Sequence, residues 1–403
     1  MFRESGGVAL EQSEQERGSQ AFGSYLRKLR EGRRLSLDAV EEMSSGFPEK
    51  VTKSHLSRIE HGLAQPSFAR LMAMSHIYGV PIAAMAERYE VALRRGMTAL
   101  DLGERSDVEI LEEIERLRRA GEINEALSMA WSLFDRRGES GFSTPIQDST
   151  SFELRGRIIY SLILAGKLES AKTLAEEVLS ARDLSEPQRL LLLELLANAS
   201  YQLRRFPMAM LAIDECRKGA RASGVRTRFA ADIDALAALV ERAMGRPAVA
   251  ITLHESAIEQ YTALGITYEA TSSSINLAQA LSDSGANAQA RDTIVRVIES
   301  LESGSLSRLR AIAYAVRAKI EFRDEKIESA EKWATKSNLI ARQIEVLPVV
   351  FRNCFYLWKI ALAKGDAAAV RLNERTLRSL VGRIESDDPE LDEFRDFMTR
   401  ADS

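Results

Sequence analysis

The sequence is poor in the residues that build metal sites, disulfides and many catalytic centres. It has two cysteines, Cys216 and Cys354, and four histidines, and their spacing matches neither a zinc site nor a disulfide framework. We expect both thiols to be buried as small apolar side chains. A glycine-rich phosphate loop and a nucleophile elbow are also missing, and residues 165–167 (AGK) lack the other residues of a nucleotide loop. The sequence therefore predicts a protein that is not an enzyme and that uses no metal or other cofactor.

Long apolar runs and a basic, apolar start are absent as well. Residues 1–20 are polar and rich in glutamate, unlike a signal peptide. The longest apolar run, Leu190–Leu196, is interrupted by Glu194 and is too short to span a bilayer. We expect residues 1–19 to form a disordered arm and the protein to be cytoplasmic, without membrane association.

The residues that are present favour a helical protein with more than one core. The chain has 403 residues, of which 28% are charged and only nine are proline. Its net charge of −4 does not by itself indicate nucleic-acid binding. Between residues 22 and 34, however, Glu31 is the one acid among five basic residues: Arg27, Lys28, Arg30, Arg33 and Arg34. This basic segment predicts local contact with a polyanion.

Residues 20–92 predict five short helices in one compact domain. Apolar residues recur at helical spacing, and capping residues mark the boundaries between the helices. Ser36, Thr52 and Ser67 start the second, third and fourth helices, Gly62 and Gly79 end the third and fourth, and Pro81 opens the fifth. In the third helix, Leu56 and Ile59 should face the core.

The third helix and the segment after it carry a family resemblance. The stretches VTKSHLSRIEHGLAQPS and LMAMSHIYGVPIAAM resemble the Xre/Cro/cI-type helix-turn-helix family over about residues 20–88. In that family the third helix lies in the DNA major groove, which implies that the base-reading residues here are Lys53, Ser54, His55, Ser57 and Arg58. The chemistry agrees, because Arg and Lys can donate to guanine O6 and N7, and Ser can bond either partner of a base pair.

Backbone contacts and one internal contact follow from the same resemblance and from the basic segment. We expect the DNA phosphates to meet Arg27, Lys28, Arg33, Arg34 and Thr52, together with free amides at the start of the third helix. The family counterpart of Glu60 pairs with an arginine of the first helix, and Arg30 is the expected partner. The turn SSGFPEK is longer than in the family, Glu41 replaces a small alanine, and Leu37 replaces a polar residue that commonly touches phosphate. These departures leave open how the second and third helices are placed.

Residues 107–400 contain a degenerate repeat. A turn residue is followed five positions later by a small or apolar residue, and the turns fall at Gly121, Gly166, Arg204, Gly245, Gly285, Glu325 and Gly365. The last four of these turns are evenly spaced along the chain. Each unit reads as two antiparallel helices, because a small residue just inside the second helix lets its neighbour approach closely. The sequence thus predicts an all-α protein in which about seven helical hairpins follow the helix-turn-helix domain.

This array resembles the tetratricopeptide-repeat (TPR) class, which implies a right-handed superhelix whose concave surface is lined by the first helix of each pair. Counting back from the turns, the residues expected to face a ligand groove are Arg157, Tyr160, Asn198, Tyr201, Asn276, Asn353 and Tyr356. Asparagine is a poor helix former, and its two-sided amide can hold a peptide backbone. Packing between helices is the alternative role for these residues.

Residues 93–106 are expected to link the two parts. The joined layout resembles the peptide-responsive Rgg/PlcR-type regulators of bacteria, which implies a homodimeric regulator that binds double-stranded DNA and whose array binds a peptide or protein effector. Two alternatives remain at this point. The chain is a protein-interaction scaffold with a vestigial helix-turn-helix, or a DNA-binding regulator whose array serves only to dimerise.

Overall fold

The computed structural model describes residues 19–20, 22–80, 82–97, 102–139, 142, 146–181, 183–223, 228–301, 306–384 and 389–401, and these contain helices and no strand. This confirms the predicted all-α class. The chain divides into two compact units, Met1–Ile114 with Asn124–Gly141, and Glu115–Ile123 with Phe142–Ser403. The division passes through the first predicted hairpin, so the linker at 93–106 stays a prediction. The predicted disordered arm lies, but for its last residue, outside the described residues.

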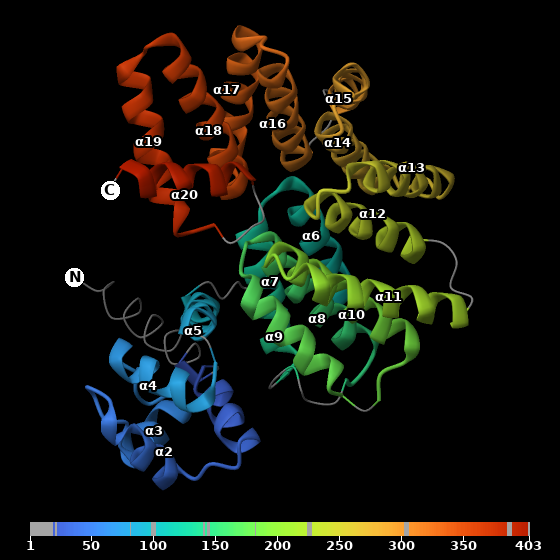
Figure 1. Ribbon diagram of the computed structural model, residues 1–403. Helices are drawn as coiled ribbons and strands as arrows, with labels where there is room; N and C mark the ends of the chain where they lie inside the picture. The colour runs from blue at the N-terminus through green and yellow to red at the C-terminus, as the bar shows by residue number, and fades with distance from the viewer. Residues whose placement is uncertain are drawn as a thin grey trace, which may run out of the picture. The chain divides into compact units, whose positions relative to one another are not determined.

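The N-terminal helices begin and end near the predicted residues (Figure 1). Residues 22–32 are helical, and they precede α2 (Leu37–Met43), the short 3-10 helix η1 (Ser44–Gly46), α3 (Lys53–Glu60), α4 (Phe68–Tyr78) and α5 (Ile82–Met97). The side chains of Ser36, Thr52 and Ser67 each accept a hydrogen bond from the backbone amide of the third residue of the helix. Gly79 ends α4 with a φ of 58°. These local caps fix the boundaries because they satisfy amides that the helix leaves free.

The core of this domain forms where the first helix crosses α3. Phe22, Leu26, Leu56 and Ile59 are at most 1% exposed. Gly23 permits the crossing, because a Cβ added there would lie 2.2 Å from the carbonyl oxygen of Ile59. The contact therefore depends on backbone packed against backbone.

Seven antiparallel hairpins follow in the described part of the chain. They pair α6 (Asp107–Ala120) with α7 (Ile123–Arg136), α8 (Ser149–Leu164) with α9 (Leu168–Leu179), α10 (Glu186–Gln202) with α11 (Phe206–Ser223), α12 (Arg228–Ala243) with α13 (Pro247–Ala263), α14 (Thr267–Asp283) with α15 (Asn287–Leu301), α16 (Ser307–Arg323) with α17 (Ile327–Gln343), and α18 (Leu347–Lys364) with α19 (Ala367–Val381). All seven predicted turn residues have a positive φ, between 59° and 93°. The predicted repeat is therefore confirmed, including its two turns without glycine.

Small residues let the paired helices approach each other. Ala171, Ala209, Ala250, Ala290 and Ala330, each five residues after a turn, are fully buried. A last helix, α20 (Pro389–Ala401), packs on α18 (Figure 1), with the Phe394 and Trp358 ring centres 5.4 Å apart. No described helix has the length and apolar character needed to cross a membrane.

Candidate DNA-binding surface and effector site

Helix α3 presents the residues that the sequence predicts for base reading. Lys53, Ser54 and Arg58 are exposed, and His55 and Ser57 are half-buried, while Leu56 and Ile59 are buried on the opposite face. The hydrogen-bonding groups of α3 are thus available on one side of a short, capped helix. Their contact with DNA stays a prediction.

The start of α3 differs from the expectation of free amides. The carboxylate of Glu41 accepts a hydrogen bond from the Lys53 amide at 2.7 Å, and Thr52 Oγ1 accepts one from the His55 amide at 3.3 Å. These bonds occupy amides that we expected to meet a phosphate. The hydrogen bond from Lys53 and the charge of Lys50, 2.9 Å away, lower the pKa of Glu41. Glu41 therefore caps α3 as an anion, which explains why an acid stands at this position.

A second acid lies beside the predicted DNA-reading residues. The Asp38 carboxylate is 2.9 Å from Lys53 Nζ, and the two side chains are 70% and 54% exposed. An exposed pair of this kind contributes little to stability, but it places a negative charge where DNA phosphates are expected. Asp38 therefore weakens the positive potential around α3.

The long turn between α2 and α3 is ordered by side-chain contacts. Ser44 is fully buried, and its Oγ accepts a hydrogen bond from the Val51 amide at 2.9 Å and donates to the Glu41 carbonyl at 2.9 Å. Further along the turn, Glu49 pairs with Arg70 of α4 at 2.8 Å. These contacts determine how α2 and α3 are placed, which the sequence left open.

Arg70 also reaches α3. Its Nη1 lies 3.0 Å from His55 Nε2. Burial, together with the positive charges of Arg70 and Arg58, lowers the pKa of His55. His55 is therefore neutral near pH 7, which suits a ring nitrogen that accepts a hydrogen bond from arginine.

Glu60 joins the first helix to α3, as predicted. Arg30 donates to it through Nε at 2.7 Å and Nη2 at 2.8 Å, and the two side chains are 11% and 1% exposed. The predicted pairing of Glu60 with Arg30 is confirmed. Arg27 also reaches this carboxylate, at 3.4 Å, and its Nη2 lies 2.8 Å from His61 Nε2.

The predicted phosphate-contacting residues thus fall into two groups. Arg27 is half-buried and engaged in the contacts just described, and Thr52 caps α3. Lys28, Arg33 and Arg34 are exposed on the end of the first helix and the turn after it. The exposed group is the better placed to meet a DNA backbone.

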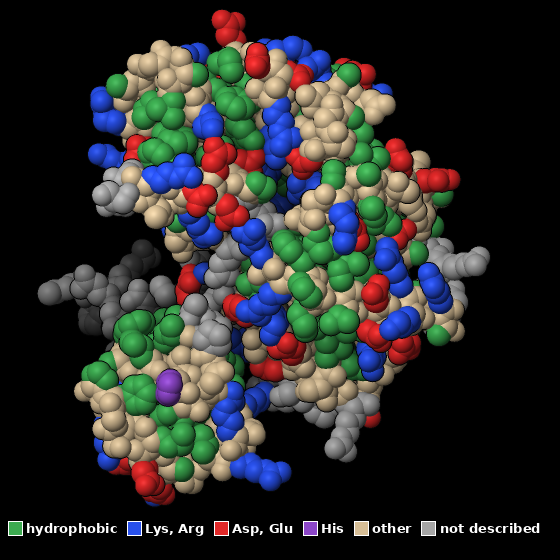
Figure 2. Space-filling model, in the orientation of Figure 1, with side chains coloured by type: hydrophobic (Ala, Val, Ile, Leu, Met, Phe, Trp, Pro, Cys, Tyr) green, Lys and Arg blue, Asp and Glu red, His purple; other side chains and the backbone are tan. Residues whose placement is uncertain are grey.

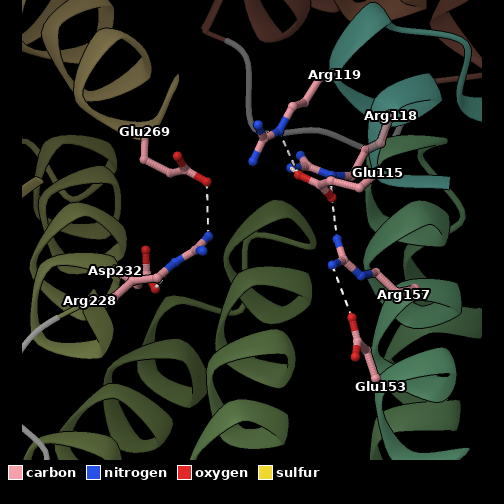
Figure 3. Close-up of polar contacts among 8 residues, drawn as sticks. All are labelled: Glu115, Arg118, Arg119, Glu153, Arg157, Arg228, Asp232 and Glu269. Atoms are coloured by element: carbon pink, nitrogen blue, oxygen red, sulfur yellow. Dashed lines mark hydrogen bonds and ion pairs between the residues drawn. The ribbon is translucent and has the colours of Figure 1, made fainter. Parts of the chain in front are cut away.

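In the array, the first helices carry a cluster of arginines that share few acids. Arg118 and Arg119 of α6 and Arg157 of α8 all contact the one carboxylate of Glu115, and Figure 3 shows the three guanidinium groups converging on it. Burial alone would raise the pKa of Glu115, but the hydrogen bond from Arg118 and the charges of Arg118 and Arg157 lower it to about 2. Arg157, a predicted groove residue, also pairs with Glu153 at 3.1 Å.

Three acidic side chains lie on the first helices of the next hairpins, Glu194 on α10, Asp232 on α12 and Glu269 on α14. Arg228 pairs with Glu269 at 2.9 Å and with Asp232 at 3.5 Å (Figure 3). Tyr261 donates a hydrogen bond to Asp232 at 2.6 Å. Burial and the charge of Asp232 raise the pKa of Glu194, on α10, to about 8. The first helices therefore bring side chains of both signs together, and Figure 2 shows blue and red side chains intermixed over the array.

The remaining predicted groove residues have different surroundings. Asn198 accepts a hydrogen bond from Gln202 at 3.0 Å on its own helix, and Tyr201 and Asn276 are half-buried. Asn353 is 1% exposed and donates to Ser337 Oγ of α17 at 2.7 Å, and Tyr356 is 5% exposed and donates to Glu390 of α20 at 2.5 Å. These last two side chains bond neighbouring helices, so they are buried contacts instead of groove-facing ones.

Sequence reasoning missed three residues of the first helices that lie close together. The guanidinium of Arg118 lies 5.0 Å from the ring centre of Tyr160 and 5.5 Å from that of Tyr268. Arg308 of α16 lies close to this group, because a Cβ on Gly121, at the end of α6, would lie 3.4 Å from the Arg308 Cβ. The even spacing of the last repeats would have found two of them, since Tyr268 and Arg308 occupy the same position in consecutive repeats.

Comparison with known protein families identifies one domain in the chain. The family described as a helix-turn-helix domain matches residues 21–87. No curated protein matches the sequence.

Several solved structures resemble the chain. The Rap protein complexed with Competence and Sporulation Factor aligns with a TM-score of 0.50 at 13% identity, over 67% of this chain and 76% of that one. PlcR of Bacillus thuringiensis, in complex with the peptide PapR7 and DNA, aligns at 0.34 and 15% identity over 81% and 96%. The apo form of the competence regulator ComR from Streptococcus vestibularis aligns at 0.29 and 15% identity over 65% and 99%.

The fold and the family match together define the class of protein. The chain has a helix-turn-helix domain at residues 21–87, followed by an array of helical hairpins whose fold is similar to that of the Rap protein.

Proposed function

We propose that this chain is a cytoplasmic, non-enzymatic transcriptional regulator that binds specific DNA sites through α3. One observation carries the proposal: within a helix-turn-helix domain, α3 is capped at its start and exposes Lys53, Ser54 and Arg58 on one face. An exposed lysine or arginine on such a helix can donate to guanine in the major groove, and Lys53 lies in the first turn of α3 and Arg58 in its last. The exposed Lys28, Arg33 and Arg34 would add contacts that do not depend on sequence.

The test is the selection of genomic fragments by the purified full-length protein, in parallel with Arg58→Ala at the same salt concentration. The proposal expects enrichment of a sequence with two half-sites, which the variant loses, because one bidentate base contact is worth about 1–3 kcal/mol. Weak, salt-sensitive and unselective binding by both proteins would refute DNA reading and favour the scaffold alternative. Glu328→Gln, on an exposed position of the array, is the matched control and should select like the wild type.

We further propose that the protein acts as a homodimer and that its array binds a peptide or protein effector. A single short DNA reader covers one half-site, so useful affinity requires two copies. The Rap structure, whose fold the chain shares, contains Competence and Sporulation Factor, and the first helices here carry charged and aromatic side chains that meet one another.

Effector binding must act through a difference in affinity between two states of the protein. The proposal therefore expects the affinity for the selected DNA site to change when the effector is present. An array that binds effectors and leaves DNA affinity unchanged would contradict the coupling, and an array that only dimerises would bind none.

A further inference from the structure

The first helices of the array repeat one position at their starts. Arg228, Tyr268 and Arg308 are evenly spaced, one repeat apart, and lie in the first turns of α12, α14 and α16. Because consecutive repeats stack, side chains at one repeat position form a column along the first helices. The surroundings of the two arginines in this column differ.

Arg228 is neutralised by two carboxylates at fixed places in the repeat. Asp232 lies about one helical turn later on the same helix, and Glu269 directly follows Tyr268 on the next first helix. Their oxygens are 3.5 Å and 2.9 Å from the Arg228 guanidinium. The positive charge at this repeat is therefore balanced within the protein.

Arg308 has neither carboxylate. Ile312 occupies the place that Asp232 has relative to Arg228, and Val349 occupies the place of Glu269. Nη1 of Arg308 is buried without a hydrogen-bond partner, and Arg308 makes no hydrogen bond or ion pair with any part of the chain that the structure describes. Burial, with the nearby charge of Arg118, lowers the pKa of Arg308 in spite of the neighbouring tyrosines. A half-buried guanidinium with no counter-charge is costly, which points to an anion that is supplied from outside.

The groups around Arg308 suit such an anion. Tyr160 and Tyr268 flank Arg118, at 5.0 Å and 5.5 Å from their ring centres. The end of α6 lies close to the start of α16. A Cβ on Gly121, three residues after Arg118, would lie 3.4 Å from the Arg308 Cβ. Both tyrosines are half-buried, and neither hydroxyl has a hydrogen-bond partner among the described residues.

The start of α16 adds to the positive potential. Its N-cap residue is Leu306, which offers no side-chain oxygen to the first-turn amides. A helix start carries a partial positive charge, so an arginine in the first turn is unfavourable unless an anion lies close to both.

We propose that Arg308, with the hydroxyls of Tyr160 and Tyr268, binds an oxyanion of the effector, either a carboxylate or a phosphate. The proposal deepens the proposed effector role and rests on it. Arg118 supports the site by holding the two rings, and its guanidinium is itself held by Glu115, whose oxygen accepts a hydrogen bond from Arg118 Nε at 2.8 Å. The oxyanion supplies the counter-charge that Ile312 and Val349 cannot.

The first test measures thermal unfolding of the full chain without ligand. Arg308→Met removes a charge that has no partner, so the Tm should rise by about 3 °C. The matched control is Arg317→Met on the same helix, because Arg317 pairs with Glu321 at 2.5 Å and Glu321 is 1% exposed. This control should lower the Tm. A Tm that falls as much in Arg308→Met as in the control would overturn the proposal.

The second test adds the oxyanion and distinguishes its two sources. Acetyl-dialanine with a free carboxylate, the same compound as its amide, and inorganic phosphate are titrated at constant ionic strength. A Tm that rises with the acid identifies a carboxylate site, and one that rises with phosphate identifies a phosphate site. The response should be absent in Arg308→Met and present in Arg317→Met. No rise with either anion, or an equal rise with the amide, would refute the site.

A third measurement covers the case in which Arg308→Met does not fold. Tyr268→Phe keeps the ring beside Arg118 and removes only the hydroxyl, so the anion should bind about tenfold more weakly with the same Tm in its absence. Unchanged affinity would count against the site. None of these measurements involves DNA, so failure here leaves the DNA-binding proposal standing, and loss of selective DNA binding leaves the anion result standing.

Discussion

Glu60 links the first helix to α3 through Arg30, and its replacement should open the helix-turn-helix domain. In Glu60→Gln the side chain keeps its shape and loses its charge. Arg30, whose side chain is 11% exposed, donates two hydrogen bonds to Glu60 at 2.7 Å and 2.8 Å. In the variant it keeps only the exposed Glu31, 3.5 Å away, as a counter-charge.

The expected cost follows from the burial of this pair. Removing one partner of a buried ion pair destabilises a protein by about 3–5 kcal/mol, because the remaining charge stays buried. Arg27 lies 3.4 Å from the same carboxylate and loses that contact too, while its 40% exposed side chain can be solvated. We therefore take the lower value of about 3 kcal/mol, which corresponds to an opening equilibrium about 100-fold larger.

Amide hydrogen exchange of the full-length protein measures this opening domain by domain. Amides in residues 22–32 and in α3 should exchange about 100-fold faster in Glu60→Gln, while amides in α16 keep the wild-type rate. Glu42→Gln, which removes an exposed acid of α2, is the control and should alter no rate beyond about threefold. Rates in α3 that stay within threefold of the wild type would refute the reasoning.

Three further predictions concern packing, electrostatic potential and pH. Gly23→Ala should destabilise the DNA-binding domain by about 3 kcal/mol in urea unfolding, because its Cβ would lie 2.2 Å from the Ile59 oxygen, whereas Gly32→Ala, with open space around it, should cost nothing. Asp38→Asn should strengthen binding to all DNA sequences about threefold in low-salt titrations, with stability unchanged, and an unaltered affinity would show that Asp38 lies away from the DNA. Burial and the charge of Asp232, opposed by Arg228, raise the pKa of Glu194 in the folded state from 4.5 to about 8, so the free energy of unfolding should fall as the pH rises between these values. Urea unfolding at about pH 5 and about pH 9 should show this fall in the wild type and a smaller one in Glu194→Gln. An equal fall in both proteins would contradict the prediction.

The boundaries of the helices could be predicted because local chemistry sets them. Ser36, Thr52 and Ser67 each bond a free amide of the helix that follows, which is a short-range contact that the sequence shows directly. Turns such as Gly245 and Gly285 have a positive φ that glycine adopts at little cost. Arg204 and Glu325 adopt the same conformation without being glycine, so only the regularity of the repeat could find them.

The rest depends on contacts between distant parts of the chain. Glu41 looked like a poor fit to its family position, and its role as a cap of α3 follows from the folded turn that brings it to Lys53. Likewise, nothing in the local pattern of α6 indicates that Arg118 meets Tyr268, which lies four hairpins further along the chain.

The ligand-facing role of the groove residues stays a prediction, and their packing could be predicted only in part for the same reason. Arg157 and Tyr160 were chosen correctly as residues of the first helices, and the structure brings both to Arg118 or its partner Glu115. Asn353 and Tyr356 satisfied the same spacing, but α17 and α20 bury them. Burial by a neighbouring helix is invisible to a count along one helix.

The most direct test of the account compares two variants on the selected DNA site and on single-base-pair variants of it. Arg58→Ala should lose about 1–3 kcal/mol on the wild-type site and should no longer distinguish bases at one position, because it removes a base contact. Arg33→Ala should weaken binding to every sequence equally and reduce the salt dependence by about one unit of slope, because it removes a phosphate contact. If both variants instead weaken all sequences alike, α3 does not read bases and the central claim fails.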